Sequence, residues 1–427
     1  MAIDPLPILA TFAGVIALGF LGYVLFDRTR ITDVLLLIAF GVLVGPVFGV
    51  FDVEGFKSAS GLVGTLALIV IMFDGGLGLH LRDLVSGIAR STVLAVVGFV
   101  ATVGLIAGVG HFHLGLDWPA AALLGTILGG TSGVIIMPII SRTTAANGTR
   151  VLLSVESALT DVLCVIGTVT LVAFFTTTAD ASSGERVGGA LRSIASQFST
   201  AIVLGLFGGV VWLRLLKRLQ SMRYSYMITL SAILFLYVGA EAVGGNGAIA
   251  ALIFGVVLGN GFIIARKLAF EGLEFSDQQR QFQSEVAFLI RAFFFVYLGV
   301  ILDPALVLQT RFLVDAAVIL AAALAARVLA VSLATRGDGE TSKDRGLITL
   351  LFPRGLAAAV LAGLPAAAGV PGTESFVALA FIVIVATNLV GTGAVVGYEM
   401  KKRRMVDVPV VAPTAEAPAS VPDEAAR

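Results

Sequence analysis

The sequence predicts an all-α polytopic membrane protein with about 13 transmembrane helices. Apolar residues fill 58% of the 427 positions and charged residues only 13%, whereas soluble domains hold roughly 45–50% apolar and 25% charged residues. The apolar residues also gather in runs of about 20, the length that crosses the hydrocarbon core of a bilayer. Both observations place most of the chain in a membrane.

The apolar runs define one transmembrane domain, residues 1–405. No small-residue cleavage site follows the first run, so we expect it to remain as a helix. A polar stretch at 176–197 follows the sixth run, and the tail at 406–427, rich in Pro, Ala and Glu, is expected to be disordered. The runs lie at about 6–26, 32–50, 61–80, 92–111, 118–141, 150–176, 196–216, 224–243, 246–265, 282–302, 312–334, 346–369 and 374–398.

The distribution of basic residues predicts the orientation in the membrane. Basic residues favour cytoplasmic loops, and most of the 28 follow odd-numbered runs, as do Lys401 to Arg404. The few that follow even-numbered runs are Lys57, Arg186, Arg192 and Arg311. We therefore expect a multi-pass protein of the cell (inner) membrane, with its N-terminus outside and its C-terminus in the cytoplasm.

Two runs are interrupted near their centres. The fifth contains Gly129-Gly130-Thr131-Ser132-Gly133, and the twelfth contains Pro353-Arg354-Gly355. Gly and Pro are common in membrane helices, but matched breaks in two halves are typical of a transporter site, because unwound backbone offers carbonyls and helix ends to an ion. The two runs are predicted to be broken helices around a binding site.

The sixth run carries acids at bilayer depth, where a carboxylate is costly and favours an ion or proton path. Ser157 and Asp161 lie one turn apart and share a face, while Glu156 shares its own face with Thr160. Other polar residues also lie near the middle of their runs, so we expect one cavity to collect them. They are Thr131, Ser132, Arg291, Arg354 and Asn388.

These residues suggest two roles. A dehydrated monovalent cation needs hard oxygen ligands, which Asp161, Ser157 and Thr131 could supply together with unwound carbonyls. Glu156 would then pair with Arg354 as a structural ion pair that braces the sixth and twelfth runs, since a buried charge needs a partner.

Several other classes of function are disfavoured. The single Cys164 and the scattered His80, His111 and His113 lack the spacing of a resident metal site. No phosphate-binding loop for ATP occurs, and a net charge of zero gives no reason to expect nucleic acid. We expect no cofactor and no enzymatic activity. An intramembrane aspartyl protease would need two paired aspartates, and a channel would need a continuous pore.

The combination resembles the monovalent cation:proton antiporters, nearest the sodium/proton exchanger branch of archaea and bacteria. The resemblance covers about residues 6–398. Its motifs are Glu156-Ser157-Ala158-Leu159-Thr160-Asp161, Phe73-Asp74-Gly75-Gly76-Leu77, Phe294-Phe295-Val296-Tyr297-Leu298-Gly299 and Pro353-Arg354-Gly355-Leu356.

The resemblance implies an inverted-repeat antiporter fold. Runs four to six and eleven to thirteen would form a mobile core, and the outer runs would form the scaffold of a homodimer. Asp161 would bind the proton and the cation in competition, with Ser157, Thr131 and Thr160 around the cation and Glu156 paired with Arg354. The expected activity is exchange of Na⁺, with Li⁺ and K⁺ as open alternatives, for protons in pH homeostasis. A sodium-coupled symporter of an organic anion is the alternative from another class.

Two departures from the family pattern remove groups that help shape the site and bear on cation selectivity. Electroneutral relatives usually show Asn-Asp and electrogenic ones Asp-Asp where this chain has Thr160-Asp161, and the common Thr-Asp-Pro of the fifth run is here Thr131-Ser132-Gly133. One carboxylate at the transport position predicts one proton per cation. Arg291 lies where electrogenic relatives tend to place a lysine, and arginine cannot release a proton in a protein. The exchange is therefore predicted to be electroneutral.

Overall fold

The computed structural model describes residues 5–29, 33–50, 60–79, 88–141, 143–178, 186–219, 225–267, 277–337, 339 and 341–406. In these ranges six helices are long and apolar enough to cross a membrane, and seven shorter apolar helices lie within the remaining predicted runs. The predicted all-helical polytopic fold is confirmed. The predicted disordered tail lies outside the described residues, except for Val406, which ends the last helix.

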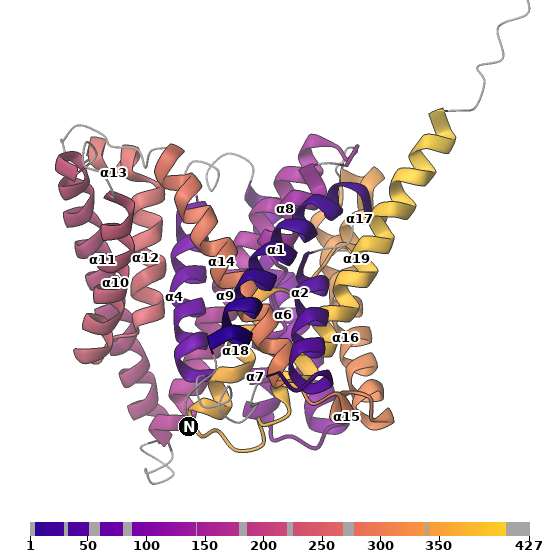
Figure 1. Ribbon diagram of the computed structural model, residues 1–427, viewed down its shortest axis with the longest axis horizontal. Helices are drawn as coiled ribbons and strands as arrows, with labels where there is room; N and C mark the ends of the chain where they lie inside the picture. The colour runs from indigo at the N-terminus through magenta and orange to yellow at the C-terminus, as the bar shows by residue number, and fades with distance from the viewer. Residues whose placement is uncertain are drawn as a thin grey trace, which may run out of the picture.

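One group of helices, here called the outer bundle, has α4 and α14 at its centre. In it α4 packs against α12, α12 against α10 and α11, and α14 against α2 and α4, while α1 packs against α2. Helices α10 to α13 lie at one end of the longest axis in Figure 1. The bundle comprises α1 (Pro5–Thr29), α2 (Asp33–Val42), η1 (Leu43–Val47), α4 (Ser60–Gly78), α10 (Arg186–Leu219), α11 (Ser225–Ala242), α12 (Gly247–Gly259), α13 (Gly261–Lys267) and α14 (Asp277–Ile301).

Glycine permits the closest packing in this bundle. A Cβ atom on Gly76 of α4 would collide with the Leu252 carbonyl oxygen of α12, and one on Gly255 would collide with the Phe73 carbonyl oxygen. Small residues at such crossings let two helix backbones approach, which is how membrane helices gain packing energy without a hydrophobic driving force. Of the two glycines in the Phe73–Leu77 motif, Gly76 therefore serves this contact, whereas a Cβ atom on Gly75 would meet nothing within 4 Å.

The second group, here called the core bundle, contains both broken helices. Helix α9 packs against α6, α7, α8 and α18, and α19 packs against α16, α17 and α18. The bundle comprises α6 (Ile88–Phe112), α7 (Trp118–Ile127), α8 (Gly133–Ser141), α9 (Asn147–Thr178), α16 (Thr310–Ala334), η2 (Thr341–Asp344), α17 (Arg345–Leu350), α18 (Leu356–Ala367) and α19 (Phe376–Val406), and the short α15 (Pro304–Val307) precedes α16.

The core bundle shows the expected repeat of a helix, a broken helix and a long helix. The fifth run breaks between α7 and α8, and the twelfth breaks between α17 and α18. The two unwound segments meet where Ser132 N–H donates to the Pro353 carbonyl at 2.8 Å. Pro353 has no N–H for a continuous helix, whereas Pro365 lies inside α18 without ending it. The predicted pair of breaks is confirmed.

Candidate cation and proton site

Asp161 lies on α9 beside the first residue of α8. A Cβ atom built on Gly133 would lie 3.1 Å from Ser157 Oγ and 3.9 Å from Asp161 Oδ2. Both side chains therefore face the break in the fifth run, and the predicted shared face of Ser157 and Asp161 is confirmed. The N-terminus of a helix carries unpaired N–H groups and a positive partial charge, so this position suits a carboxylate.

Asp161 differs from the polar residues around it in exposure. Glu156, Ser157 and Thr160 are each 1% exposed, whereas Asp161 is only partly buried. Within the part of the chain that the structure describes, Asp161 forms no ion pair. It is thus the carboxylate of α9 that an ion or proton can reach.

Glu156 is held in a buried network on another face of α9. Its Oε1 atom accepts a hydrogen bond from Arg327 Nη1 at 2.9 Å, and its Oε2 atom accepts one from Arg327 Nη2 at 3.4 Å. Thr131 Oγ1 donates to Glu156 Oε1 at 2.9 Å. A buried carboxylate is stable only when it is paired and hydrogen-bonded, and these contacts meet both conditions.

The predicted ion pair between Glu156 and Arg354 is therefore wrong. Arg327 on α16 takes that place, and its guanidinium also donates to the carbonyls of Ile348 and Leu351 beside the second break. The pair thus braces the sixth run against the eleventh and the end of α17. Arg327 lies inside the eleventh apolar run, 312–334, but its depth in that run does not identify its partner.

Arg354 stabilises the crossing of the two unwound segments. Its Nη1 atom donates to the Gly130 carbonyl, its backbone N–H donates to Thr387 Oγ1 at 3.0 Å, and its carbonyl accepts from Asn388 Nδ2 at 2.9 Å. Its guanidinium also lies close enough to Asp161 and Glu156 to interact electrostatically. Arg354 therefore places a buried positive charge near Asp161 but forms no direct ion pair with it.

The two threonines of the predicted cation site belong to the Glu156 side. Thr131 N–H donates to Thr160 Oγ1 at 3.1 Å, and the two hydroxyl oxygens are 3.3 Å apart. This confirms that Glu156 and Thr160 share a face. Ser157 Oγ donates to the Ser154 carbonyl at 3.0 Å, which leaves its lone pairs available to a cation. Ser157 is the hydroxyl that lies with Asp161 beside Gly133.

Arg291 was expected in the same cavity, but its described contacts are in the outer bundle. Its guanidinium lies 5.7 Å from the centre of the Phe288 ring, and it interacts electrostatically with Asp74 of α4. Although Arg291 lies near the middle of its run, as the other residues do, its side chain does not belong to the core site. The other predicted midplane residues, Thr131, Ser132, Arg354 and Asn388, do meet at the crossing of the two breaks.

The donor set suits a monovalent cation as cargo. Among the described residues no group of three or more His, Cys, Asp and Glu is arranged to hold a metal. One carboxylate and one hydroxyl at a helix break supply hard oxygen atoms with a single negative charge, which suits an ion that must also leave.

Crossed broken helices around an accessible carboxylate define the inverted-repeat class of membrane transport proteins. A family profile described as "Sodium/hydrogen exchanger, transmembrane" matches residues 15–397. The chain belongs to the sodium/hydrogen exchanger family.

Similar proteins differ in the cation named for them. The K⁺/H⁺ antiporter NhaP2 of Shewanella sp. (strain ANA-3) is 28% identical over 370 residues, which cover 85% of this chain and 61% of the relative. The Na⁺/H⁺ antiporter 1 of Methanocaldococcus jannaschii is 24% identical over 364 residues, covering 81% and 82%. The chain spans about three fifths of the length of the NhaP2 relatives.

The fold matches a solved antiporter structure. The sodium proton antiporter MjNhaP1 of Methanocaldococcus jannaschii at pH 8 superposes with a TM-score of 0.73 at 21% identity, covering 93% of this chain and 97% of that one. This agreement confirms the predicted antiporter fold.

Proposed function

We propose that the protein exchanges a monovalent cation for a proton at Asp161. The observation that carries the proposal is the contrast on α9: Glu156 is paired and buried, while Asp161 is partly accessible and has Ser157 and the start of α8 beside it. A carboxylate with limited solvation binds a proton readily, and the same oxygen atoms bind a cation once the proton has left. Proton and cation then compete for one site.

The charges of the core cluster support exchange of one proton for one cation. Glu156 and Asp161 supply two negative charges, and Arg327 and Arg354 supply two positive charges. The cluster is neutral when Asp161 is empty, and it gains one positive charge with either a proton or a cation. Arginine keeps its proton, so both loaded states carry the same charge and the complete cycle moves no net charge.

Alternating access would come from movement of the core bundle against the outer bundle. Asp161, the crossing of the breaks and the Glu156–Arg327 brace all belong to the core bundle, so they can move as a unit. We place the N-terminus outside and the C-terminus in the cytoplasm, on the distribution of basic residues. A homodimer formed through the outer bundle is proposed from the family resemblance.

The cation is proposed to be Na⁺, and K⁺ is the second candidate. Among the similar proteins one is named for Na⁺ and another for K⁺, so similarity favours neither alone. Asp161 is the one carboxylate proposed to contact the cation, and Ser157 adds a neutral hydroxyl, so the electrostatic field at the site is weak and selectivity depends on cavity size.

Proton flux in proteoliposomes tests the proposal. A pH-sensitive dye inside the vesicles should report alkalinisation or acidification when Na⁺, Li⁺ or K⁺ is added to the wild-type protein. Asp161→Asn should abolish the response to every cation while the protein remains folded, because an amide cannot change protonation. Exchange at near wild-type rate in Asp161→Asn would overturn the proposal.

A further inference from the structure

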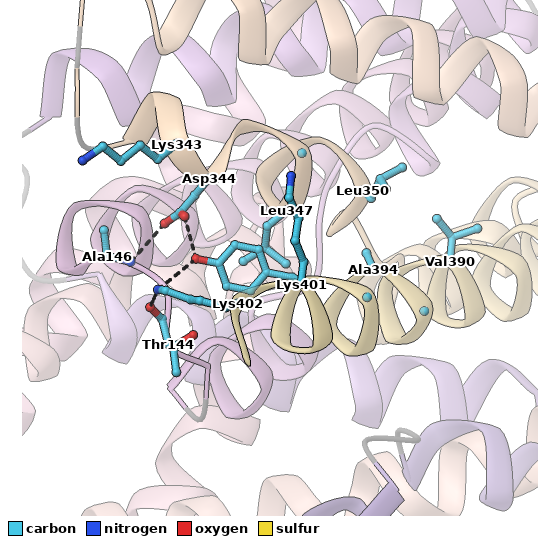
Figure 2. A pocket seen from close by; sticks show the side chains of 14 residues that line it. Thr144, Ala146, Lys343, Asp344, Leu347, Leu350, Val390, Ala394, Lys401 and Lys402 are labelled. Atoms are coloured by element: carbon cyan, nitrogen blue, oxygen red, sulfur yellow. Dashed lines mark hydrogen bonds between the residues drawn. The ribbon is translucent and has the colours of Figure 1, made fainter. Parts of the chain in front are cut away.

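A large pocket opens at the end of the core bundle where α17, α19 and the segment before α9 meet. Its cavity volume is about 1050 Å³, at the upper end of the roughly 300–1,000 Å³ of ligand pockets. Figure 2 shows Lys343 on one side and Lys401 and Lys402 on α19, with Leu347, Leu350, Val390 and Ala394 along the wall. Asp161 and its neighbours do not line it.

The floor of the pocket is a fixed polar network around Asp344. Its carboxylate accepts hydrogen bonds from Ala146 N–H at 3.0 Å, Thr149 Oγ1 at 2.9 Å and Tyr398 OH at 2.6 Å. Lys402 Nζ donates to the Thr144 carbonyl and, at 3.4 Å, to Tyr398 OH. These contacts join η2, α19 and the start of α9, so the shape of the pocket is set by the fold.

The charge on the pocket is positive. Three lysines and one carboxylate line it, and the carboxylate is already satisfied by three donors. Lys343 and Lys401 are exposed, and neither forms an ion pair with a described residue. The ammonium groups of Lys343 and Lys401 are therefore available to an anion, and Lys402 lies at the same rim of the pocket.

The apolar wall lies at a different depth from the lysines. Val390 and Ala394 lie within the apolar part of α19, whose candidate span ends at Lys402. Leu350 is 38% exposed at the end of α17. A ligand that fills the pocket must have an anionic group at the membrane surface and an apolar chain that enters the hydrocarbon layer.

We propose that the pocket binds an anionic phospholipid. The phosphate lies against Lys343 and Lys401, and an acyl chain lies along Leu347, Leu350 and Val390. Basic pockets between membrane helices bind such headgroups, and each lysine near the surface contributes about fivefold in affinity. The lipid ties η2 and α17, at the start of the second broken helix, to α19, the last helix of the second repeat.

Native mass spectrometry of the full-length protein in detergent tests this site. Phosphatidylglycerol, phosphatidylcholine and inorganic phosphate are each added to the wild-type protein, and the retained mass is measured. Phosphatidylglycerol should be retained at least about tenfold better than phosphatidylcholine, and inorganic phosphate should not displace it. Equal retention of the two lipids, or displacement by phosphate, would overturn the proposal.

Two kinds of variant locate the site. Lys343→Gln combined with Lys401→Gln should reduce retention of phosphatidylglycerol by roughly tenfold or more. Gly393→Leu fills the pocket from α19, where a Cβ atom meets nothing within 4 Å, and should reduce retention while the melting temperature is kept. The matched control is Arg266→Gln, which removes an exposed charge from α13 in the outer bundle. Unchanged retention in both pocket variants, or an equal loss in the control, would contradict the site.

Discussion

Two carboxylates on one helix have opposite surroundings. Glu156 is 1% exposed and bonded to Arg327 and Thr131, whereas Asp161, five positions further along α9, is partly accessible beside the start of α8. The difference follows from helix geometry, since five residues rotate the side chain away from the first face. One acid is fixed as structure, and the other remains available for exchange.

The largest difference between the two carboxylates is expected in the free energy of unfolding when each one is replaced. Glu156→Gln leaves Arg327 as a buried charge without its carboxylate, and should lower the free energy of unfolding by about 3–5 kcal/mol. Asp161→Asn, its matched control, should change that free energy by less than about 1 kcal/mol, because Asp161 forms no ion pair with a described residue. Denaturant titration in mixed micelles measures both. Equal losses in the two variants would contradict the division of roles.

A double-mutant cycle sharpens the same comparison by testing the partner of Glu156. Glu156→Gln with Arg327→Gln should show a coupling energy of roughly 1–3 kcal/mol, because the two residues are in direct contact. The control cycle combines Glu156→Gln with Arg354→Gln and should show a smaller coupling energy than the cycle with Arg327. Arg354 interacts with Glu156 electrostatically, but in the part of the chain that the structure describes it forms no hydrogen bond or ion pair with it. A larger coupling in the cycle with Arg354 would restore the pairing expected from the sequence.

The sequence predicted the fold better than the partners within the site. Apolar length fixed the crossings, and Gly129-Gly130 and Pro353 located the two breaks, because these features act along the chain itself. Helical spacing correctly separated the face of Ser157 and Asp161 from the face of Glu156 and Thr160. Each is a local property of the chain.

Side-chain partners from different helices were harder to predict. Arg291, Arg327 and Arg354 all lie inside apolar runs, but depth along a helix does not say which way a side chain points or which helix it faces. In the structure Arg327 forms an ion pair with Glu156, and Arg354 donates a hydrogen bond to the Gly130 carbonyl. Arg291 interacts electrostatically with Asp74. Packing between distant segments decides this, and hydrophobic pattern does not encode it.

Hydroxyl groups on the two faces of α9 should differ in their effect on transport. Ser157→Ala removes an oxygen beside Asp161 and should raise the KM for the cation about fivefold. This factor corresponds to the loss of about 1 kcal/mol, which is typical of one polar interaction. Thr160→Val, on the Glu156 side, should leave that KM within about twofold while it lowers stability, because Thr160 accepts from Thr131 N–H. Initial rates of dye response against cation concentration report both values. A larger KM change in Thr160→Val would place the cation on the Glu156 side.

The most direct test of the central claim is whether exchange responds to membrane potential. A thiocyanate gradient sets the potential across proteoliposomes without adding a second candidate cation, and the cation-driven proton flux is measured at fixed pH. Because Asp161 is the one exchangeable charge in this account, the flux should be the same at zero and at imposed potentials of either sign. A flux that increases with one sign of the potential and decreases with the other would mean that a second group titrates during the cycle, and the fixed role of Glu156 would be contradicted.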